Sequence, residues 1–345
     1  MIPFEAELPR EMTLRLNDII ELANYQSGLT GWAVGKNLNT GETGCYPGHF
    51  VEEIVEKFQD EKDEAWYTSQ NTVHSWGNNS NFTNGLGDSK VRNTPEMNDT
   101  IFQNKHSVVD IVITKFHTVF LTEDGKVLTC GHGPSGRLGH GKEETHLYPK
   151  LIDSLSHYQC IAIAASNHHT VVLTQCGNIF TFGLNDFNQL GHSPSAPFVK
   201  SSLTPNLVYS KNIKNKNITG VTAARFHTVV YGEREVYVFG TNGGQLGLLK
   251  SEEVVPIPKL VSRLLRNEAC VKKVVASEGA TLCLFGDGEL YILQDFVCRK
   301  IKDIGIFLPG TTIKMSGGAL SLKGLESDKA EPLQIAILQS SGVVS

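Results

Sequence analysis

One phrase of the sequence recurs four times, and this repetition constrains the fold more than any other feature. It reads FHTVFLTEDGKVLTCGHG from Phe116, HHTVVLTQCGNIFTFGLN from His168, FHTVVYGEREVYVFGTN from Phe226 and GATLCLFGDGELYILQD from Gly279. The copies are spaced by 52, 58 and 53 residues, and partial copies begin at 73 and 334. A second anchor, Leu-Gly, follows in step at 86–87, 138–139, 190–191 and 246–247. Two anchors that repeat together indicate a repeat architecture.

Each copy reads as a set of short β-strands. A β-branched, apolar run over 108–114 precedes the first copy, a turn follows at 123–125, and an alternating strand covers 126–130. Three or four strands at a period near fifty residues make one blade of a β-propeller. A single blade cannot bury its faces alone, so it must stack on its neighbours. The sequence therefore predicts an all-β fold.

The repeated histidines and glycines are predicted to serve the architecture. Histidine is a common metal ligand and proton carrier, but equivalent positions of successive blades lie about one blade apart and cannot converge on one ion. We expect each ring to hydrogen-bond the backbone of the next strand, and the glycines to form turns and loops. The residues in these structural roles are His117, His169, His227, Gly131, Gly183, Gly240, Gly139, Gly191 and Gly247.

These phrases resemble the RCC1 repeat, over residues 73–345. The segment CGHGPSGRLGHG from Cys130, with TFGLNDFNQLG and FGTNGGQLG after it, is similar to the RCC1 domain of the family of inhibitors of Bruton tyrosine kinase. The resemblance implies a propeller of about seven blades, whereas about five copies are visible and the last stops early. The expectation is an incomplete ring in a fragment of a longer product.

Residues 1–56 have a different pattern, with short strands and turns of a small barrel. The order resembles an SH3 domain, and GWAVGKNLNTGETGCYPGHFV is similar to the SH3 domain of phosphoinositide 3-kinase regulatory subunits. The resemblance implies an aromatic groove for a proline-rich ligand beside acidic residues. Carried over by position, the ligand-binding residues are Phe4, Glu7, Glu11, Trp32, Pro47 and Phe50. The alternative is that the aromatic residues only fill a small core.

The SH3-like groove departs from its family at three positions. Ile2, Cys45 and Phe50 stand where the family has tyrosines, so hydroxyl donors to a ligand are missing. Residues 57–72 are charged and carry no strand pattern, which favours a linker.

Charge is unevenly distributed along the chain. The net charge is −5, but residues 1–72 hold 13 acidic and 5 basic residues, and the remainder holds 23 acidic and 26 basic residues. An acidic first domain suits a basic ligand, whereas the larger part is too nearly neutral to indicate nucleic acid. The seven cysteines form no CxxC pair and are expected to be reduced and buried. No signal peptide or membrane span is visible, so a cytoplasmic location, or a nuclear one, is expected.

Enzyme motifs are weak or missing. GHGPSG at 131–136 satisfies GxGxxG, but no helix pattern follows, so loop glycines are the better interpretation. His168, His132, His140 and His192 are expected in solvated loops. We expect no enzyme, no cofactor and no metal. The prediction is a protein-interaction scaffold in signalling, whose propeller binds a protein such as a tyrosine kinase, as an inhibitor. The alternative is a guanine nucleotide exchange factor for a small GTPase; oligomeric state is left open.

Overall fold

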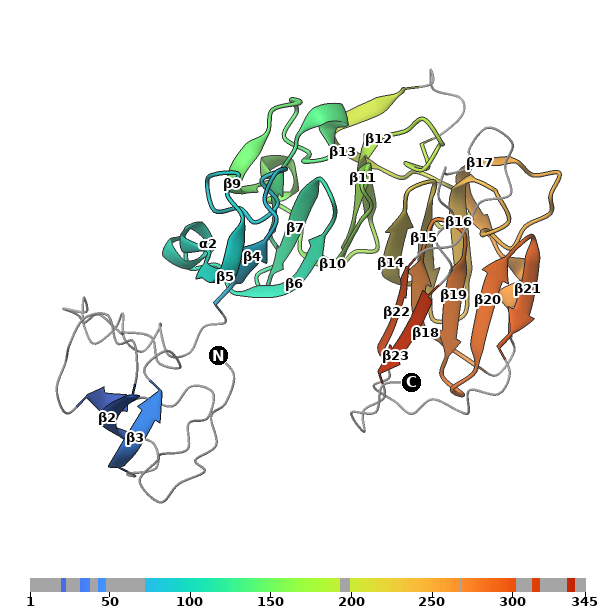
Figure 1. The fold of residues 1–345 in the computed structure, drawn as a ribbon. Coiled ribbons are helices and arrows are strands. Elements are labelled where there is room, and N and C mark those ends of the chain that lie inside the picture. The colour runs from blue at the N-terminus through green and yellow to red at the C-terminus, as the bar shows by residue number, and fades with distance from the viewer. Residues whose placement is uncertain are drawn as a thin grey trace. The chain divides into compact units, whose positions relative to one another are not determined.

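The computed structural model describes residues 20–22, 32–37, 43–47, 72–192, 199–266, 269–301, 312–316 and 334–338. Side chains are described for 72–192, 199–266 and 269–301. The chain divides into two compact units, Met1–Ser69 and Gln70–Ser345. Figure 1 labels the elements of both units.

The first unit contains a three-stranded antiparallel sheet in the order β1-β2-β3. Its strands are β1 (Ile20–Leu22), β2 (Trp32–Asn37) and β3 (Thr43–Pro47). β2 and β3 pair with Trp32 opposite Pro47 and Lys36 opposite Thr43. A short connection rich in Asn, Thr and Gly joins these two strands, which is typical of a β-hairpin.

The described part of the second unit contains four antiparallel sheets of four strands each, and the strands of each sheet pair in chain order. We name each sheet by its first and last strands. The strands are β6 (Val108–Ile113), β7 (His117–Thr122), β8 (Val127–Gly131), β9 (His146–Leu151), β10 (Cys160–Ala165), β11 (His169–Thr174), β12 (Ile179–Leu184), β13 (Ser201–Leu207), β14 (Ile218–Ala224), β15 (His227–Gly232), β16 (Val236–Thr241), β17 (Val254–Leu260), β18 (Val271–Ala276), β19 (Thr281–Phe285), β20 (Leu290–Gln294) and β21 (Val297–Lys300).

The second strand of each sheet carries the recurring phrase and lies in the interior. All residues of β7, β11 and β15 are buried, as are those of β8. A tight turn returns each second strand to the third, and Gly125, with φ of +71°, supplies the left-handed position that the first of these turns requires. Each copy of the phrase therefore folds into one hairpin whose two strands are covered on both faces.

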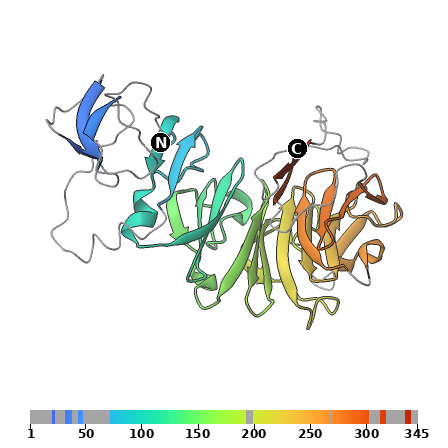
Figure 2. The same cartoon turned by 90° about the horizontal axis from the view of Figure 1, so that it is seen from below.

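Neighbouring sheets cover one another through their first and second strands. β10 contacts β6 and β7 on one side and β14 on the other, and β14 in turn contacts β18. Figure 2 shows the green, yellow and orange sheets following one another in this order. One apolar cluster joins Val119 and Leu121 of β7 to Ile163 of β10. Such stacking gives each blade the neighbours that it needs to bury its apolar faces.

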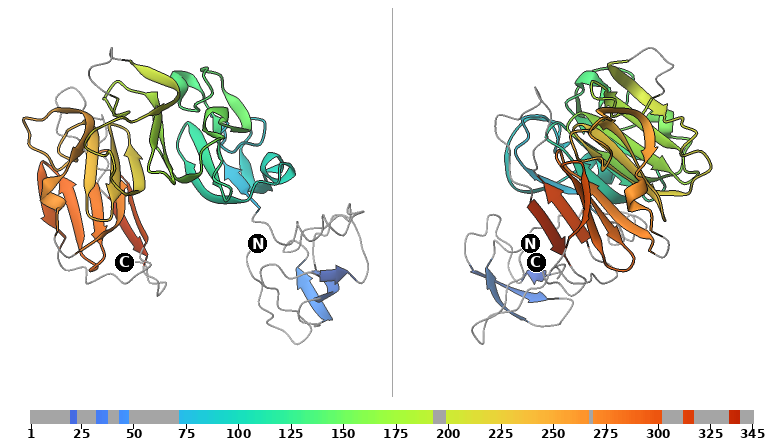
Figure 3. Two further views of the ribbon diagram at one scale, coloured as in Figure 1. Left: turned by 180° about the vertical axis from the view of Figure 1, so that it is seen from behind. Right: turned by 90° about the vertical axis from the view of Figure 1, so that its right-hand side faces the viewer.

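Two smaller sheets are also present among the described residues of the second unit. β4 (His74–Gly77) pairs with β5 (Arg92–Met97), and the short helix α2 (Asp99–Gln103) follows, with Asn98 as its N-cap. β22 (Thr312–Ser316) pairs with β23 (Gln334–Leu338). β22 contacts β18, and the red and orange strands lie side by side in Figure 3. Three turns of 3-10 helix, Pro134–Gly136, Asp153–Leu155 and Ser262–Leu264, lie in the connections.

The all-β fold class and the propeller-type sheets predicted from the sequence are confirmed. The prediction for the cysteines is only partly right: Cys130, Cys160 and Cys283 are buried, but Cys176 is exposed in the turn between β11 and β12. Burial raises the pKa of the Cys130 thiol to about 12, as expected for an unreactive core thiol. Within the part of the chain that the structure describes, no helix is long and apolar enough to cross a membrane.

Candidate functional site

Two sets of loops gather at the same end of the four-stranded sheets. In an antiparallel sheet paired in chain order, the connection between the first and second strands and the connection between the third and fourth strands lie at one end. Backbone hydrogen bonds join them, since His132 N donates to Phe116 O and Leu184 N donates to His168 O. We call this end the loop face; it includes residues 114–116, 132–145, 166–168, 185–192, 225–226 and 242–253.

A group of basic and aromatic side chains lies on the loop face of the β6–β9 sheet. The guanidinium of Arg137 lies 4.9 Å from the ring centroid of Phe116, and the Nζ of Lys115 lies 5.3 Å from the same centroid. Arg137 Nη1 donates to Asn167 O at 2.7 Å, and its Nε donates to Pro134 O at 2.9 Å. Arg137 is 6% exposed. The arginine therefore ties one sheet to the loop of the next while it keeps its charge.

The β14–β17 sheet repeats this pairing with Arg225 and Phe226. The Arg225 guanidinium lies 4.9 Å from the ring centroid of Phe226, which also forms an edge-to-face ring pair with Phe187 at 4.7 Å. Arg225 Nε is shielded from solvent and has no hydrogen-bond partner within the described residues. A buried N–H without a partner is unfavourable. An acceptor on a bound molecule would relieve this deficit.

His168 lies within the electrostatic reach of both arginines. Its pKa is lowered to about 4, first because the ring is buried and then because Arg225 and Arg137 repel its charged form; Asp186 opposes the shift. Neither arginine forms an ion pair with a carboxylate among the described side chains. Two arginine charges without an ion-paired carboxylate therefore lie beside aromatic rings on the loop face, which suits an acidic group of a partner.

The repeated histidines lie beneath this face. His117 Nε2 is 2.8 Å from Thr170 Oγ1, His169 Nε2 is 2.7 Å from Thr228 Oγ1, and His227 Nε2 is 3.2 Å from Thr281 Oγ1. Each pair joins one sheet to the next. The expected backbone partner was wrong: the ring bonds a threonine hydroxyl, because the threonine that follows each histidine position is brought beneath the ring of the preceding copy.

The threonine hydroxyls determine the tautomer of these rings. Thr170 Oγ1 donates to Arg137 O at 2.9 Å, and Thr228 Oγ1 donates to Gln189 O at 2.7 Å. A hydroxyl has one proton to donate, so the rings of His117 and His169 must donate their Nε2–H to these threonines. Burial lowers the pKa of all three histidines to about 3. The rings are therefore neutral, and they neither converge nor offer a free nitrogen for a metal or a reaction.

The glycines of the repeat occupy left-handed positions where side chains do not fit. Gly131, Gly183 and Gly240 are the last or next-to-last residues of the third strands, with φ of +114°, +110° and +122°, and a Cβ there would lie 2.5, 2.5 and 2.3 Å from a carbonyl oxygen of the adjacent turn. At Gly139, Gly191 and Gly247 a Cβ would lie within 2.8 Å of a side chain of the next sheet, Phe182, Phe239 and Leu293 respectively.

Two loop histidines that were expected to be solvated are hydrogen-bonded instead. His140 Nε2 is 2.9 Å from Thr129 Oγ1, and His192 Nε2 is 3.0 Å from Thr181 Oγ1. The pKa of His140 is lowered to about 4, and burial of the ring is the largest cause. The sequence held a signal for these hydrogen bonds, because each histidine directly follows the Leu-Gly anchor and lies at the same distance from a strand threonine.

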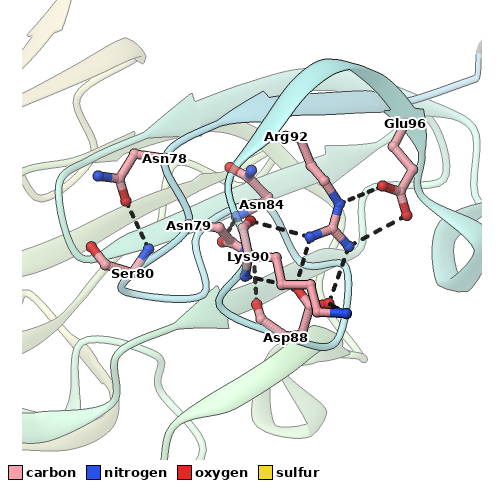
Figure 4. Close-up of polar contacts among 8 residues, drawn as sticks. All are labelled: Asn78, Asn79, Ser80, Asn84, Asp88, Lys90, Arg92 and Glu96. Carbon is pink, nitrogen blue, oxygen red and sulfur yellow. Dashed lines mark hydrogen bonds and ion pairs between the residues drawn. The ribbon is translucent and has the colours of Figure 1, made fainter.

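The loop between β4 and β5 concentrates charge but compensates it internally (Figure 4). Arg92 Nη1 donates to Asp88 Oδ1 at 2.8 Å, and the guanidinium also pairs with Glu96. The hydrogen bond from Arg92 is the main cause of the lowered pKa of Asp88. Asn84 N donates to Asn79 Oδ1 at 2.9 Å. The Arg92 charge is thus compensated by Asp88 of the loop and Glu96 of β5, whereas Arg137 and Arg225 have no such carboxylate partner among the described side chains.

The SH3-like residues are described only in part. Trp32 and Pro47 lie opposite each other in the β2–β3 pair. Phe4, Glu7, Glu11 and Phe50 lie outside the described residues. The side chains of this unit are likewise outside the description, so the groove remains a prediction. Across the described residues, no group of three or more His, Cys, Asp or Glu side chains is placed to hold a metal ion.

Comparisons with known proteins agree with this architecture. Residues 124–173 and 177–231 match the regulator of chromosome condensation (RCC1) repeat, 108–137 and 160–189 match a second description of the same repeat, and 1–48 match the SH3 domain. The human inhibitor of Bruton tyrosine kinase is 41% identical over 259 residues, which is 74% of this chain and 19% of that protein. The Xenopus laevis protein of that name is 39% identical over 279 residues, 79% of this chain and 20% of its own length. The chain thus spans about a fifth of these relatives.

Solved structures share the fold at low identity. The crystal structure of human WBSCR16 has a TM-score of 0.60 at 16% identity, with 89% of this chain and 86% of that chain covered. Prp20p from Saccharomyces cerevisiae has a TM-score of 0.50 at 15% identity, with 83% of each chain covered. The repeated hairpins, the glycines that end their strands and these matches lead to one conclusion. The chain carries RCC1 repeats and, at its start, a match to the SH3 domain.

Proposed function

We propose that this chain is a non-enzymatic protein-interaction scaffold in signalling, whose loop face binds a protein partner. The observation that carries the proposal is the row of Lys115, Arg137 and Arg225, whose charges lie against aromatic rings and lack carboxylate partners among the described side chains. Arginine and aromatic side chains dominate the energetics of protein interfaces. The chemistry fits an acidic segment on the partner.

The relatives suggest which class of partner to test. They are named for inhibition of Bruton tyrosine kinase, and the aligned region includes the sheets that form the loop face. By this analogy the partner is a tyrosine kinase, and binding reduces its activity. The SH3-like unit would bind a proline-rich segment through Trp32 and the neighbouring groove positions, and two linked modules would raise the effective concentration of one bivalent partner. The scaffold would act in the cytoplasm.

Binding of a purified tyrosine kinase to the full chain tests the proposal, with Bruton tyrosine kinase as the probe. The variant Lys115→Gln/Arg225→Gln should weaken binding on the order of tenfold or more, since each lost charge-assisted contact is worth about 1.5–3 kcal/mol. The matched control is Lys211→Gln/Lys214→Gln, which removes two exposed charges from the connection after β13, at the opposite end of the sheet. The control should bind as the parent does.

Equal binding by both double variants would contradict the loop face as the partner site. Release of fluorescent guanine nucleotide from a panel of small GTPases separates the scaffold from the exchange-factor alternative. Acceleration of release by the parent chain would favour exchange activity, whereas an unchanged rate together with kinase binding supports the scaffold.

A further inference from the structure

The connection between β12 and β13 holds a buried amide with an unused donor. Gln189 is 0% exposed, and its Oε1 accepts a hydrogen bond from Phe187 N at 2.9 Å. This bond fixes the orientation of the amide, because a backbone N–H requires an acceptor. The Nε2 at the other side of the amide is then the donor, and no described residue accepts its hydrogen bond. A buried N–H without a partner is unfavourable.

The corresponding glutamine of the next copy uses both of its polar atoms. Gln245 Oε1 accepts from Gly243 N at 2.7 Å, and its Nε2 donates to Thr241 O at 2.7 Å. The loop before Gln189 is one residue longer than the loop before Gln245, counted from the glycine near the end of the third strand. The unused donor is therefore particular to the loop of Gln189 and is not a general property of the repeat.

The first copy shows which group occupies the equivalent place. Its loop has the same length as the loop of Gln189, and Arg137 stands at the glutamine position. The longer arginine crosses to the next sheet, where its Nη1 donates to Asn167 O at 2.7 Å. Arg225 stands at the position of Asn167 in the following sheet. Gln189 has a shorter side chain and makes no such bond through its amide, so this crossing lacks the group that Arg137 supplies at the first.

Arg225 contributes a second unused donor at the same interface. Its Nε is shielded from solvent, and no described residue accepts its hydrogen bond. The two loops are held together, because Thr228 Oγ1 donates to Gln189 O at 2.7 Å. The rings of Phe187 and Phe226 also lie 4.7 Å apart, and the Arg225 guanidinium lies over the Phe226 ring. Two donors that lack acceptors are thus brought to one interface.

The charge at this interface favours a carboxylate as the missing acceptor. Arg225 forms no ion pair with a carboxylate among the described side chains. A carboxylate only accepts hydrogen bonds and carries the opposite charge. Burial and then Arg225 lower the pKa of His168, so its ring is neutral at neutral pH, while Asp186 opposes that shift. The Asp186 charge would repel the second charge of a phosphate.

We propose that Gln189 and Arg225 form a binding site for one carboxylate group. One oxygen accepts from Gln189 Nε2 and the other from Arg225 Nε, so the group supplies the acceptors that both donors lack. Arg225, Phe187 and His168 are partly exposed, and the carboxylate enters from the loop face. An Asp or Glu side chain of the protein partner supplies it, a use that rests on the proposed function.

Titration of the full chain with sodium acetate at constant ionic strength tests the site. NMR signals of the side-chain N–H groups of Gln189 and Arg225 report the binding, and acetamide is the neutral counterpart of acetate. Both signals should move along one saturation curve with acetate and stay in place with acetamide. Unmoved signals, or a larger response to inorganic phosphate at the same pH and ionic strength, would overturn the proposal.

Gln189→Glu places a carboxylate inside the site. Its Oε1 still accepts from Phe187 N, and the oxygen that replaces Nε2 pairs with Arg225, so acetate binding should weaken about tenfold or more. The matched control is Gln175→Glu, which makes the same charge change at an exposed position in the turn between β11 and β12. The control should bind acetate as the parent does. Acetate binding that survives in Gln189→Glu would place the carboxylate elsewhere and overturn the proposal.

Kinase binding separates this site from the proposed function. Gln189→Glu should also weaken binding of Bruton tyrosine kinase about tenfold, whereas Gln175→Glu should leave it unchanged. If the parent binds acetate at this site but does not bind the kinase, the proposed function fails and the carboxylate site stands. If the parent binds the kinase while acetate moves neither signal, the carboxylate site fails and the proposed function stands.

Discussion

The two sides of the β6–β9 sheet are built from the same repeat positions, yet one side is complete in the described structure and the other is not. Toward the β10–β13 sheet, His117 donates to Thr170, which donates to Arg137 O. Toward the β4–β5 sheet, Thr118 Oγ1 donates to Thr83 O at 2.7 Å, the equivalent bond, but no histidine among the described residues donates to it. The comparison separates what the repeat needs within a sheet from what it needs between sheets.

The interface with the β10–β13 sheet combines an apolar contact with a series of uncharged hydrogen bonds. Val119 and Ile163 pack across it, while the histidine, the threonine and the carbonyl satisfy one another beneath the loop face. The β18–β21 sheet supports this view because it lacks the histidine. Ala280 stands in the histidine position there and is fully buried, so the apolar contact is the constant part of the design and the polar chain is added to it.

Acidification should have the largest effect, and it should act on the complete interfaces. His117, His169 and His227 have folded pKa values of about 3, below the ordinary value of 6.5. The unfolded chain therefore binds more protons between these values, and the free energy of unfolding falls as pH falls from about 6.5 toward 3. Each histidine contributes up to about 1.4 kcal/mol per pH unit in that window. Urea unfolding midpoints from pH 7.5 to 4.5 measure the slope.

The control for this prediction is His117→Gln, which keeps an N–H donor and cannot titrate. The free energy of unfolding of this variant should fall less steeply with falling pH, because its unfolding takes up about one proton fewer. Carboxylates such as Asp88, whose pKa is lowered mainly by Arg92, contribute equally to both proteins. An unchanged slope would mean that His117 is already protonated in the folded chain, against the bonding of its ring.

Valine substitutions at the strand-ending glycines should come next in size. Gly131→Val combines a left-handed backbone with a clash against Phe116 O, and should lower the free energy of unfolding by about 3 kcal/mol or more. Gly141→Val is the matched control: its φ is +81°, but its Cβ would meet only Thr204 Cγ2 at 3.6 Å. It should lose about 1–2 kcal/mol. Denaturant unfolding of each variant gives both values.

Gly77→Val then sharpens the comparison between the two sides. If another strand pairs with β4 on the edge away from β5, the loss should match that of Gly131→Val, because a backbone would then pass over Gly77 as Phe116 O passes over Gly131. A loss equal to that of Gly141→Val would show that the edge is open and that only the backbone conformation matters at this position.

The sequence predicted the strands and the repeat well because both depend on local pattern. The phrase from Phe116 contains β7, its turn and β8 in the expected order, and the glycines at its end have the backbone that only glycine adopts easily. The histidine partner was missed for a different reason. The backbone of the next strand was expected, but the hydroxyl of Thr170 is closer, and only the stacking of two copies brings it beneath His117.

The basic and aromatic row was missed because it is assembled across copies. Arg137 occupies the position of Gln189 and Gln245 in the later repeats, and its charge reaches the loop of the following sheet at Asn167 O. Nothing in one copy alone indicates that contact. The SH3-like groove was inferred from residue order, and of its residues the structure places Trp32 and Pro47 on paired strands.

Thr170→Val and Thr118→Val should differ from each other in their effect on the free energy of unfolding, and Thr118→Val should have the smallest effect of the variants. Thr170→Val leaves both the His117 Nε2–H and Arg137 O without a partner, and should cost about 2–4 kcal/mol. Thr118→Val leaves only Thr83 O, which keeps the Cys130 thiol at 3.7 Å, and should cost about 1 kcal/mol. The valine fills the same space in both, so the difference in unfolding free energy isolates the missing histidine. Equal losses would mean that a donor from the strand completing the β4–β5 sheet reaches Thr118 as His117 reaches Thr170, and the two sides of the sheet would then be alike.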